Sequence, residues 1–122
     1  KYLNGNNDVI VKDGHVSNRI NVEDLSAIVI KYLIEDYKFK YLNISEENKI
    51  ENFEAIKYVS EKLNLVIPNA ISYKSKKISE TMRSFYEVDR EVRSKIINNE
   101  FKYKFKNNDY KEILLKLTKK LL

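Results

Sequence analysis

Apolar and polar positions repeat with two different periods along this chain, and together they predict helices mixed with short strands. A short apolar run covers residues 9–11, and the turn "KDG" and an extended segment at residues 15–20 follow it. The segments "FKYLNIS" (39–45) and "FKYKFK" (101–106) alternate with period two, which is typical of strands. We therefore expect one α/β unit over residues 1–122, or an α+β unit as an isolated fragment, with helices packed on a few short strands.

Three segments carry the three-and-four spacing of a helix with one buried face. The first helix begins after Asn21, a good N-cap, and Asp24 is placed to complete a variant capping box. The second helix is capped by Asn52, and the third, at the end of the sequence, by Asn108 or Asp109. The expected inner positions of the first helix are Val22, Leu25, Ile28, Val29, Tyr32 and Leu33.

The remaining segments have weaker patterns. Pro68 requires the second helix to have ended, and residues 71–80 read as a mobile connection. Residues 82–88 fit a strand or a loop, and residues 94–99 fit a short helix. Because there is neither a repeat nor an internal linker, the pattern predicts a single domain.

Composition removes several classes of function. The absence of cysteine excludes disulfides and thiolate metal sites, and makes a cytoplasmic location the default. The longest apolar run is far shorter than the roughly 18 residues that a membrane span needs, so we expect no contact with a membrane. His15 is the single histidine, and a catalytic role for it requires a nearby carboxylate that the sequence does not locate. Since the sequence starts with Lys1, we expect a fragment of a longer protein.

The net charge of +5 raises nucleic acid as a partner, and "FKYKFK" offers lysines for phosphates and aromatic rings for stacking. The same alternation is what a half-buried strand requires, so we do not expect a nucleic-acid partner. The chain contains 23 lysine and arginine residues, and only four of these are arginines. Lysine replaces a solvated charge but not a planar guanidinium fork, which makes Arg19 a candidate anion ligand. The alternative is an ion pair of Arg19 with Asp24 or Asp89.

Two Tyr-x-x-x-Lys patterns are present, Tyr58 with Lys62 and Tyr73 with Lys77. In such a pair the lysine lowers the pKa of the phenol, so that the tyrosine can act as an acid or a base. In a chain with nine tyrosines and so many lysines, about this number of matches arises by chance, and we assign neither a role. With two glycines in the chain there is no Gly-rich phosphate loop, so we expect no cofactor site here.

Three segments in order resemble the extended short-chain dehydrogenases of the NAD-dependent epimerase/dehydratase (nucleoside-diphosphate-sugar epimerase) family. "NRINVEDLSAIVIKYL" is similar to the family's Arg-x-x-His-Val-Asp-Asp-Leu-Ala stretch, and "KYLNISEENKIENFEAIKYVSEKLNL" to the strand, loop and helix that follow. "ISETMRSFYEVDREVRSKIINNEFKYKFKNNDYKEILLKL" is similar to the tail of one bacterial branch. Asn21 stands where the family has histidine, Lys102 where it has glycine, and Asn108 where it has proline.

The resemblance implies a C-terminal, substrate-binding portion of a Rossmann-type enzyme. Members of the family, which act as isomerases and oxidoreductases, carry NAD(P) and the catalytic Tyr-x-x-x-Lys in an N-terminal half that these residues do not match. The resemblance therefore implies no catalytic and no cofactor-binding residue in this chain. It implies an anionic substrate such as a nucleotide-sugar, with Arg19 on its diphosphate and Arg83 and Asn21 lining the cleft. The first alternative is a homodimerising interaction module. A basic nucleic-acid-binding domain is the second and less favoured alternative.

Overall fold

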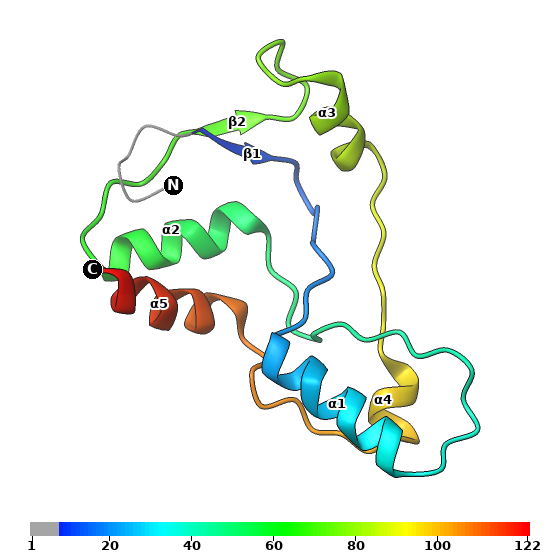
Figure 1. Ribbon diagram of the computed structural model, residues 1–122. Coiled ribbons are helices and arrows are strands. Elements are labelled where there is room, and N and C mark those ends of the chain that lie inside the picture. The colour runs from blue at the N-terminus through cyan, green and yellow to red at the C-terminus, as the bar shows by residue number, and fades with distance from the viewer. Residues whose placement is uncertain (1–7) are drawn as a thin grey trace.

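The computed structural model describes residues 8–122, which form five helices and a two-stranded parallel sheet (Figure 1). In chain order the elements are β1 (Val9–Val11), α1 (Val22–Ile34), α2 (Asn52–Lys62), β2 (Ala70–Ser72), α3 (Glu80–Glu87), α4 (Lys95–Asn99) and α5 (Tyr110–Leu121). The mixed α/β character that the sequence predicts is confirmed.

The sheet joins two segments that lie about sixty residues apart. Val9 pairs with Ala70 and Val11 with Ser72 in parallel register, and α2, which lies between the strands in sequence, packs against β1. Parallel strands need a crossover connection, and α2 supplies it. β2 falls in the segment that the sequence pattern assigns to a mobile connection. That prediction is wrong for residues 71–72, because the pairing with β1 orders residues whose own periodicity is weak, whereas residues 73–79 form no helix or strand.

α2 and α5 lie side by side and form one part of the core (Figure 1). Ile56 and Val59 on α2 are buried, as the helical spacing predicts. On α5 the buried residue is Leu115, whereas Leu117 and Leu121, which the spacing places on the inner face, are exposed, so that prediction is wrong for α5. Asp109 caps α5 by accepting a hydrogen bond from the backbone N–H of Glu112. Asn52 is the first residue of α2 rather than its cap.

A second part of the core lies where α1 and α4 meet. Its buried members are Ile28, Ile97 and Phe101, and half-buried aromatic and aliphatic side chains pack around them. The ring of Tyr37 lies 4.4 Å from that of Phe101, centroid to centroid. This cluster shows how α4, a helix of one to two turns, is held although its own hydrogen bonds are few.

Neither predicted period-two strand forms. Residues 39–45 and 101–106 have no strand partner in residues 8–122, and the backbone of Lys102 is left-handed, with φ of 52°. The alternation of burial is nevertheless present in the second segment: Phe101 is 1% exposed, whereas Lys102 is exposed. The pattern identified the buried face correctly and its hydrogen bonding wrongly, because Phe101 packs against helices instead of lying in a sheet.

Residues 82–88 are also predicted wrongly as a strand or a loop, since α3 covers most of them. Ser79 caps this helix through a 3.2 Å hydrogen bond from the backbone N–H of Met82. α3 has no fully buried residue, and both Met82 and Phe85 are exposed. A short amphipathic helix whose apolar face is open gives little hydrophobic signal, and the cap is the better evidence for it.

The N-terminus of α1 differs from the expected capping box. Asn21 is the N-cap as predicted, and its side-chain oxygen accepts from the N–H of Glu23 at 2.8 Å. Asp24 instead is buried and accepts hydrogen bonds from the backbone N–H groups of Lys106 and Asn107, each at 2.9 Å. The variant capping box is therefore a wrong prediction, because Asp24 fastens α1 to a distant segment.

The inner face of α1 is narrower than its sequence predicts. Ile28 is fully buried, but Val22, Val29 and Leu33, which the spacing places on the same face, are exposed, Leu33 by 77%. Ile34 is equally exposed. α1 thus presents apolar side chains on more than one face, and only one of these faces is covered by residues 8–122.

Candidate functional site

Arg19, the candidate anion ligand, lies in the extended segment between β1 and α1. Its guanidinium carbon is 4.0 Å from the centre of the Tyr110 ring. One terminal nitrogen donates to the backbone oxygen of Ile50 at 3.2 Å, and the other to the side-chain oxygen of Asn52 at 3.4 Å. The planar shape and the two donor nitrogens are both used, which explains why lysine does not stand here.

The alternative predicted for Arg19, an ion pair with Asp24 or Asp89, is wrong. Asp24 accepts from backbone and tyrosine donors, and Asp89 pairs with two other basic residues. Across residues 8–122, no carboxylate oxygen lies within 4.0 Å of the Arg19 nitrogens. Its charge still acts on Glu46, whose pKa it lowers against the larger, raising effect of burial. Arg19 is half-buried with neutral hydrogen-bond acceptors.

Arg83, the second predicted ligand, lies on α3. One of its terminal nitrogens donates to the backbone oxygens of Ser75, at 3.4 Å, and Ile78, at 3.3 Å. Its Nε is buried and has no hydrogen-bond partner within residues 8–122. Arg83 therefore closes the loop that leads into its own helix, and no contact of Arg83 is shared with Arg19. The two arginines are not brought together, and their binding of an anion stays a prediction, as does that of Asn21.

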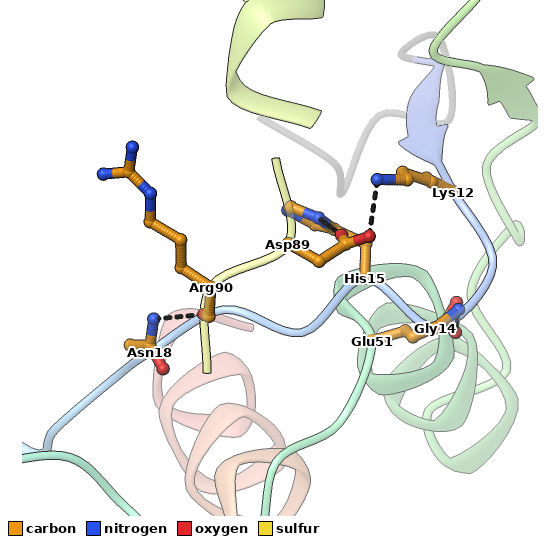
Figure 2. Close-up of polar contacts among 7 residues, drawn as sticks. All are labelled: Lys12, Gly14, His15, Asn18, Glu51, Asp89 and Arg90. Carbon is orange, nitrogen blue, oxygen red and sulfur yellow. Dashed lines mark hydrogen bonds and ion pairs between the residues drawn. The ribbon is translucent and has the colours of Figure 1, made fainter. Parts of the chain in front are cut away.

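The carboxylate that sequence reasoning could not locate for His15 is Asp89 (Figure 2). His15 Nδ1 lies 2.8 Å from one oxygen of Asp89, and Lys12 Nζ lies 2.7 Å from the other. The ring of Tyr86 packs 4.8 Å from the imidazole. Hydrogen bonds from Lys12, first, and from His15 lower the pKa of Asp89. Nothing in the sequence signals this pairing, because 74 residues separate His15 from Asp89.

Further hydrogen bonds around His15 tie the same segments together (Figure 2). The N–H of Gly14 donates to a carboxylate oxygen of Glu51, and the amide of Asn18 donates to the backbone oxygen of Arg90, both at 2.7 Å. The cavity beside His15 has a volume of about 20 Å³, which is room for one water molecule. We call this cluster, Lys12, Gly14, His15, Asn18, Glu51, Asp89 and Arg90, the clasp, because its hydrogen bonds join residues 12–18 to Glu51 and to residues 89–90.

The two Tyr-x-x-x-Lys patterns have structural contacts. The hydroxyl of Tyr58 donates to Glu112, which raises the pKa of the phenol, so the proton is harder to remove and Tyr58 is a poorer general acid. Lys62 lies over the ring of Tyr58, 5.7 Å from its centre, instead of beside the hydroxyl. The ring of Tyr73 lies under two lysines other than Lys77. Neither pair has the arrangement of an acid–base dyad.

The buried charged residue that sequence reasoning missed is Glu46. The polar segment around it reads as a solvated loop, yet Glu46 is only 2% exposed. Its Oε1 has no hydrogen-bond partner within residues 8–122, and burial raises its pKa. Glu46 lines a cavity of about 350 Å³ together with residues of the segment that enters α4. No local sequence signal identifies such a residue, because its burial depends on segments nearly fifty residues away.

Two classes of site are not found in the described part of the chain. No three histidine, cysteine, aspartate or glutamate side chains within residues 8–122 are grouped closely enough to hold a metal ion. The same residues contain no helix with the length and apolar character to span a bilayer.

Comparison with known proteins gives a fold relative without a function. No protein-family model matches the sequence, and no curated protein is significantly similar to it. A solved structure from Silicibacter pomeroyi DSS, described as "a functionally unknown conserved protein", is similar with a TM-score of 0.81 and 24% sequence identity. The match covers 93% of this chain and 41% of that one, so our chain spans about two fifths of its length. At this identity the similarity concerns the fold alone.

The turn at Gly14 does not have the geometry of a dinucleotide-binding loop. A Rossmann-type site needs a glycine-rich turn directly between a strand and a helix, with free N–H groups facing the pyrophosphate. Gly14, with φ of 71°, lies in the turn after β1, but an extended segment follows it and its N–H donates to the carboxylate of Glu51. A carboxylate at this position repels a phosphate. The turn at Gly14 is therefore not a phosphate-binding turn of the Rossmann type.

Proposed function

We propose that this chain is the C-terminal, substrate-binding portion of an NAD(P)-dependent epimerase/dehydratase-like protein. Its substrate is an anionic small molecule of the nucleotide-sugar class. Dinucleotide binding and the catalytic tyrosine and lysine belong to a Rossmann-type half outside these 122 residues. Alone, the chain binds substrate and does not transfer hydride. A cytoplasmic location is part of the same proposal.

The parallel pairing of β1 and β2 is the observation that carries the proposal. Parallel strands are found almost exclusively in sheets of several strands with helices on both faces, and isolated two-stranded sheets are marginally stable. Here two strands of three residues each are joined through α2 in a βαβ arrangement. This arrangement fits the edge of a larger parallel sheet, as in a Rossmann-type enzyme. The similarity to two fifths of a longer solved structure supports the same view.

The charge of Arg19 supports an anionic substrate. Its guanidinium is half-buried, lies against Tyr110 and has no carboxylate within ion-pair distance in residues 8–122. A partly desolvated guanidinium with no carboxylate in contact attracts an anion more strongly than an exposed lysine does, and the buried carboxylate of Glu46 acts on it only from beyond ion-pair distance. The N-terminus of α1, two residues further on, adds a second positive element.

Titration with UDP-glucose, followed by isothermal calorimetry and by amide chemical shifts, tests the proposal. We expect saturable binding with shifts near Arg19, and a loss of about tenfold in affinity for Arg19→Lys, since the fork is lost. Arg90→Lys is the matched control, because the Arg90 side chain is exposed and points away from the other labelled residues (Figure 2). Equal binding by wild type and Arg19→Lys, or no binding of any nucleotide-sugar, contradicts the proposal.

Exposed apolar side chains favour a second candidate, a homodimerising interaction module. Leu33 and Ile34 on α1 are each 77% exposed, and Phe85 on α3 is 68% exposed. Exposed apolar surface of this kind marks association sites. Sedimentation velocity distinguishes the two candidates: a concentration-dependent dimer that Leu33→Lys dissociates supports the second, and a monomer at all concentrations removes it.

A further inference from the structure

The outer face of α1 carries an apolar stripe along the whole helix. Its members are exposed by 45% to 77%, and they are Val22, Val29, Ile30, Leu33 and Ile34. At 3.6 residues per turn they span about 140° of the helix surface, opposite the buried side chains of Asp24 and Ile28. A helix that is apolar on two opposite faces is typical of a helix covered on both. We call these five residues the outer stripe.

Ser26 lies in the middle of the outer stripe, one turn from Val22 and one from Ile30. Its hydroxyl donates to the backbone oxygen of Val22 at 2.7 Å, so it is satisfied within the helix. Covering a polar group that keeps its hydrogen bond costs little free energy. A small side chain at this place also lets a second helix approach closely. The middle of the stripe can therefore be dehydrated without leaving a polar atom unpaired.

The chain exposes more surface than its mass predicts. Its solvent-accessible area is 8935 Å², whereas a folded monomer of 14.5 kDa exposes roughly 6,900 Å². The seven residues outside the described range contribute at most roughly 1,200 Å² to this area, so an excess of about 1,000 Å² belongs to residues 8–122. A standard interface buries about 800 Å² on each partner. The excess is thus large enough for one complete interface.

The charges beside the outer stripe are complementary to those of an antiparallel copy of α1. Glu23 lies in the first turn and Lys31 in the last, and both flank the side of the stripe formed by Ile30 and Ile34. In an antiparallel pair the first turn of each helix lies beside the last turn of the other, which brings Glu23 near Lys31 of the second copy. Opposite ends of the two helix dipoles then also meet.

The present ion pair of Lys31 does not prevent this arrangement. Lys31 pairs with Glu35 one turn further along the helix at 3.1 Å, and the carboxylate side is about half exposed. Exposed pairs of this spacing contribute roughly 0.3 to 0.5 kcal/mol, so Lys31 can share its charge with a second carboxylate. A parallel pair instead places equal dipole ends side by side, which is unfavourable.

We propose that α1 is the interface of a homodimer in which two copies pack their outer stripes together as antiparallel helices. The two-fold axis passes close to Val29, and Val22 of one copy lies beside Leu33 and Ile34 of the other. This inference rests on the second candidate function, the interaction module, and names its surface and its geometry. Phe85 on α3, which is also exposed, lies outside the interface.

Sedimentation velocity on two matched variants tests the surface. We expect a reversible dimer of the wild-type chain below about 500 µM, a limit that includes weak dimers. Ile30→Lys should raise the dissociation constant at least tenfold, because it buries a charge in the middle of the interface. Phe85→Lys is the control, since Phe85 is 68% and Ile30 56% exposed, and it should keep the wild-type constant within about twofold.

Carbodiimide crosslinking tests the orientation with the native side chains. In a mixture of ¹⁴N- and ¹⁵N-labelled chains, mass spectrometry identifies amide links that join one copy to the other. We expect a link from the carboxylate of Glu23 to the amine of Lys31 between copies, and its loss in Glu23→Gln. The dimer of Glu23→Gln itself should persist, since the apolar stripe supplies most of the interface.

Three results overturn the proposal, and they separate it from the proposed functions. A monomer at all concentrations removes both the α1 dimer and the interaction module. A dimer that Phe85→Lys dissociates and Ile30→Lys does not leaves the module standing but contradicts the assignment to α1. A dimer without any Glu23–Lys31 link between copies contradicts the antiparallel geometry. None of the three affects the titration with UDP-glucose, which tests the substrate-binding function independently.

Discussion

The carboxylate of Asp24 accepts a hydrogen bond from the hydroxyl of Tyr103 at 2.8 Å, although 79 residues separate the two. Backbone N–H groups of Lys106 and Asn107 donate to the same carboxylate. Burial raises the pKa of Asp24, but these hydrogen bonds outweigh it and lower the pKa below its usual value. Burial and the neighbouring Asp24 raise the pKa of Tyr103 to about 12. The first turn of α1 is thereby fixed to the segment before α5.

Replacing Asp24 by alanine removes an acceptor from three donors at once. We expect Asp24→Ala to lower the free energy of unfolding by about 3 kcal/mol, because two backbone N–H groups are left without partners in a buried place. Urea denaturation measures the loss. Asp36→Ala, a change at an exposed position, serves as the control and should shift stability by less than about 0.5 kcal/mol. Equal stabilities of the two variants contradict this role of Asp24.

The lowered pKa of Asp24 also predicts a pH dependence. The folded pKa lies below the unfolded value of about 3.9, so the unfolded chain binds the proton more tightly. The stabilisation is complete above about pH 4 and is lost as the pH falls through the folded pKa. Urea denaturation between pH 2 and pH 5 should show a steeper loss for wild type than for Asp24→Asn. Parallel curves exclude Asp24 as the source.

The sequence predicted the features that neighbouring residues determine, namely helix caps and the buried faces of helices. Asn21 and Asp109 are caps as expected, and Ile56 and Val59 lie on the buried face of α2. Asp24 shows the limit: its position in the first turn fits a capping box, but donors from the far end of the chain bind it more strongly. The hydrogen-bond partner of such a residue cannot be predicted from sequence spacing alone, because the fold determines which distant donors come close to it.

Strands were predicted less well than helices for a related reason. The alternation at Phe101 identifies a buried face, and burial is what hydrophobic periodicity reports. Whether such a segment enters a sheet depends on an available partner strand, which the segment itself does not encode. β2 shows the opposite case. The sequence around Ile71 has little periodicity, yet it forms a strand because Ile71 pairs with Ile10.

In the candidate site too, locally determined features were predicted and long-range contacts were not. The choice of arginine at position 19 was a readable signal, because a guanidinium does what lysine cannot, and the structure uses its planar form. Its partners, Ile50 and Asn52, were not predictable. The pairing of His15 with Asp89 and the burial of Glu46 depend on contacts across 40 or more residues, which no motif records.

The stacking of Arg19 on Tyr110 predicts a specific loss with lysine. Arg19→Lys keeps the charge but removes the flat contact with the ring and one of the two hydrogen bonds, so we expect a loss of about 1 to 2 kcal/mol in unfolding free energy. Thermal and urea denaturation measure it. Arg90→Lys should be neutral. If both variants are as stable as wild type, Arg19 does not hold the segment before α2 against α5.

The clasp at Asp89 predicts a local effect rather than a global one. Asp89→Asn weakens the contacts with Lys12 and His15, but the Asp89 side chain is 55% exposed, so total stability should change by less than about 1 kcal/mol. Amide hydrogen exchange should rise in residues 12–18 and 89–92, where the two segments meet. Asp13→Asn is the control, because Asp13 is exposed in the turn between Lys12 and Gly14. Unchanged exchange in both segments is the contrary result.

The burial of the Glu46 carboxylate predicts that Glu46→Gln stabilises the protein. Burial raises its folded pKa above the unfolded value of about 4.3, so ionisation is easier in the unfolded chain. The resulting destabilisation appears as the pH rises through these two values and is complete above the folded pKa. Glu46→Gln removes the charge and should raise the unfolding free energy at pH 7 by about 1 kcal/mol.

The pH profile distinguishes this cause from a general improvement in packing. The stability difference between Glu46→Gln and wild type should close below about pH 4, where Glu46 is protonated in both the folded and the unfolded chain. Glu47→Gln, an exposed neighbour, should show no such difference at any pH. A gain that persists at pH 3 points to packing instead.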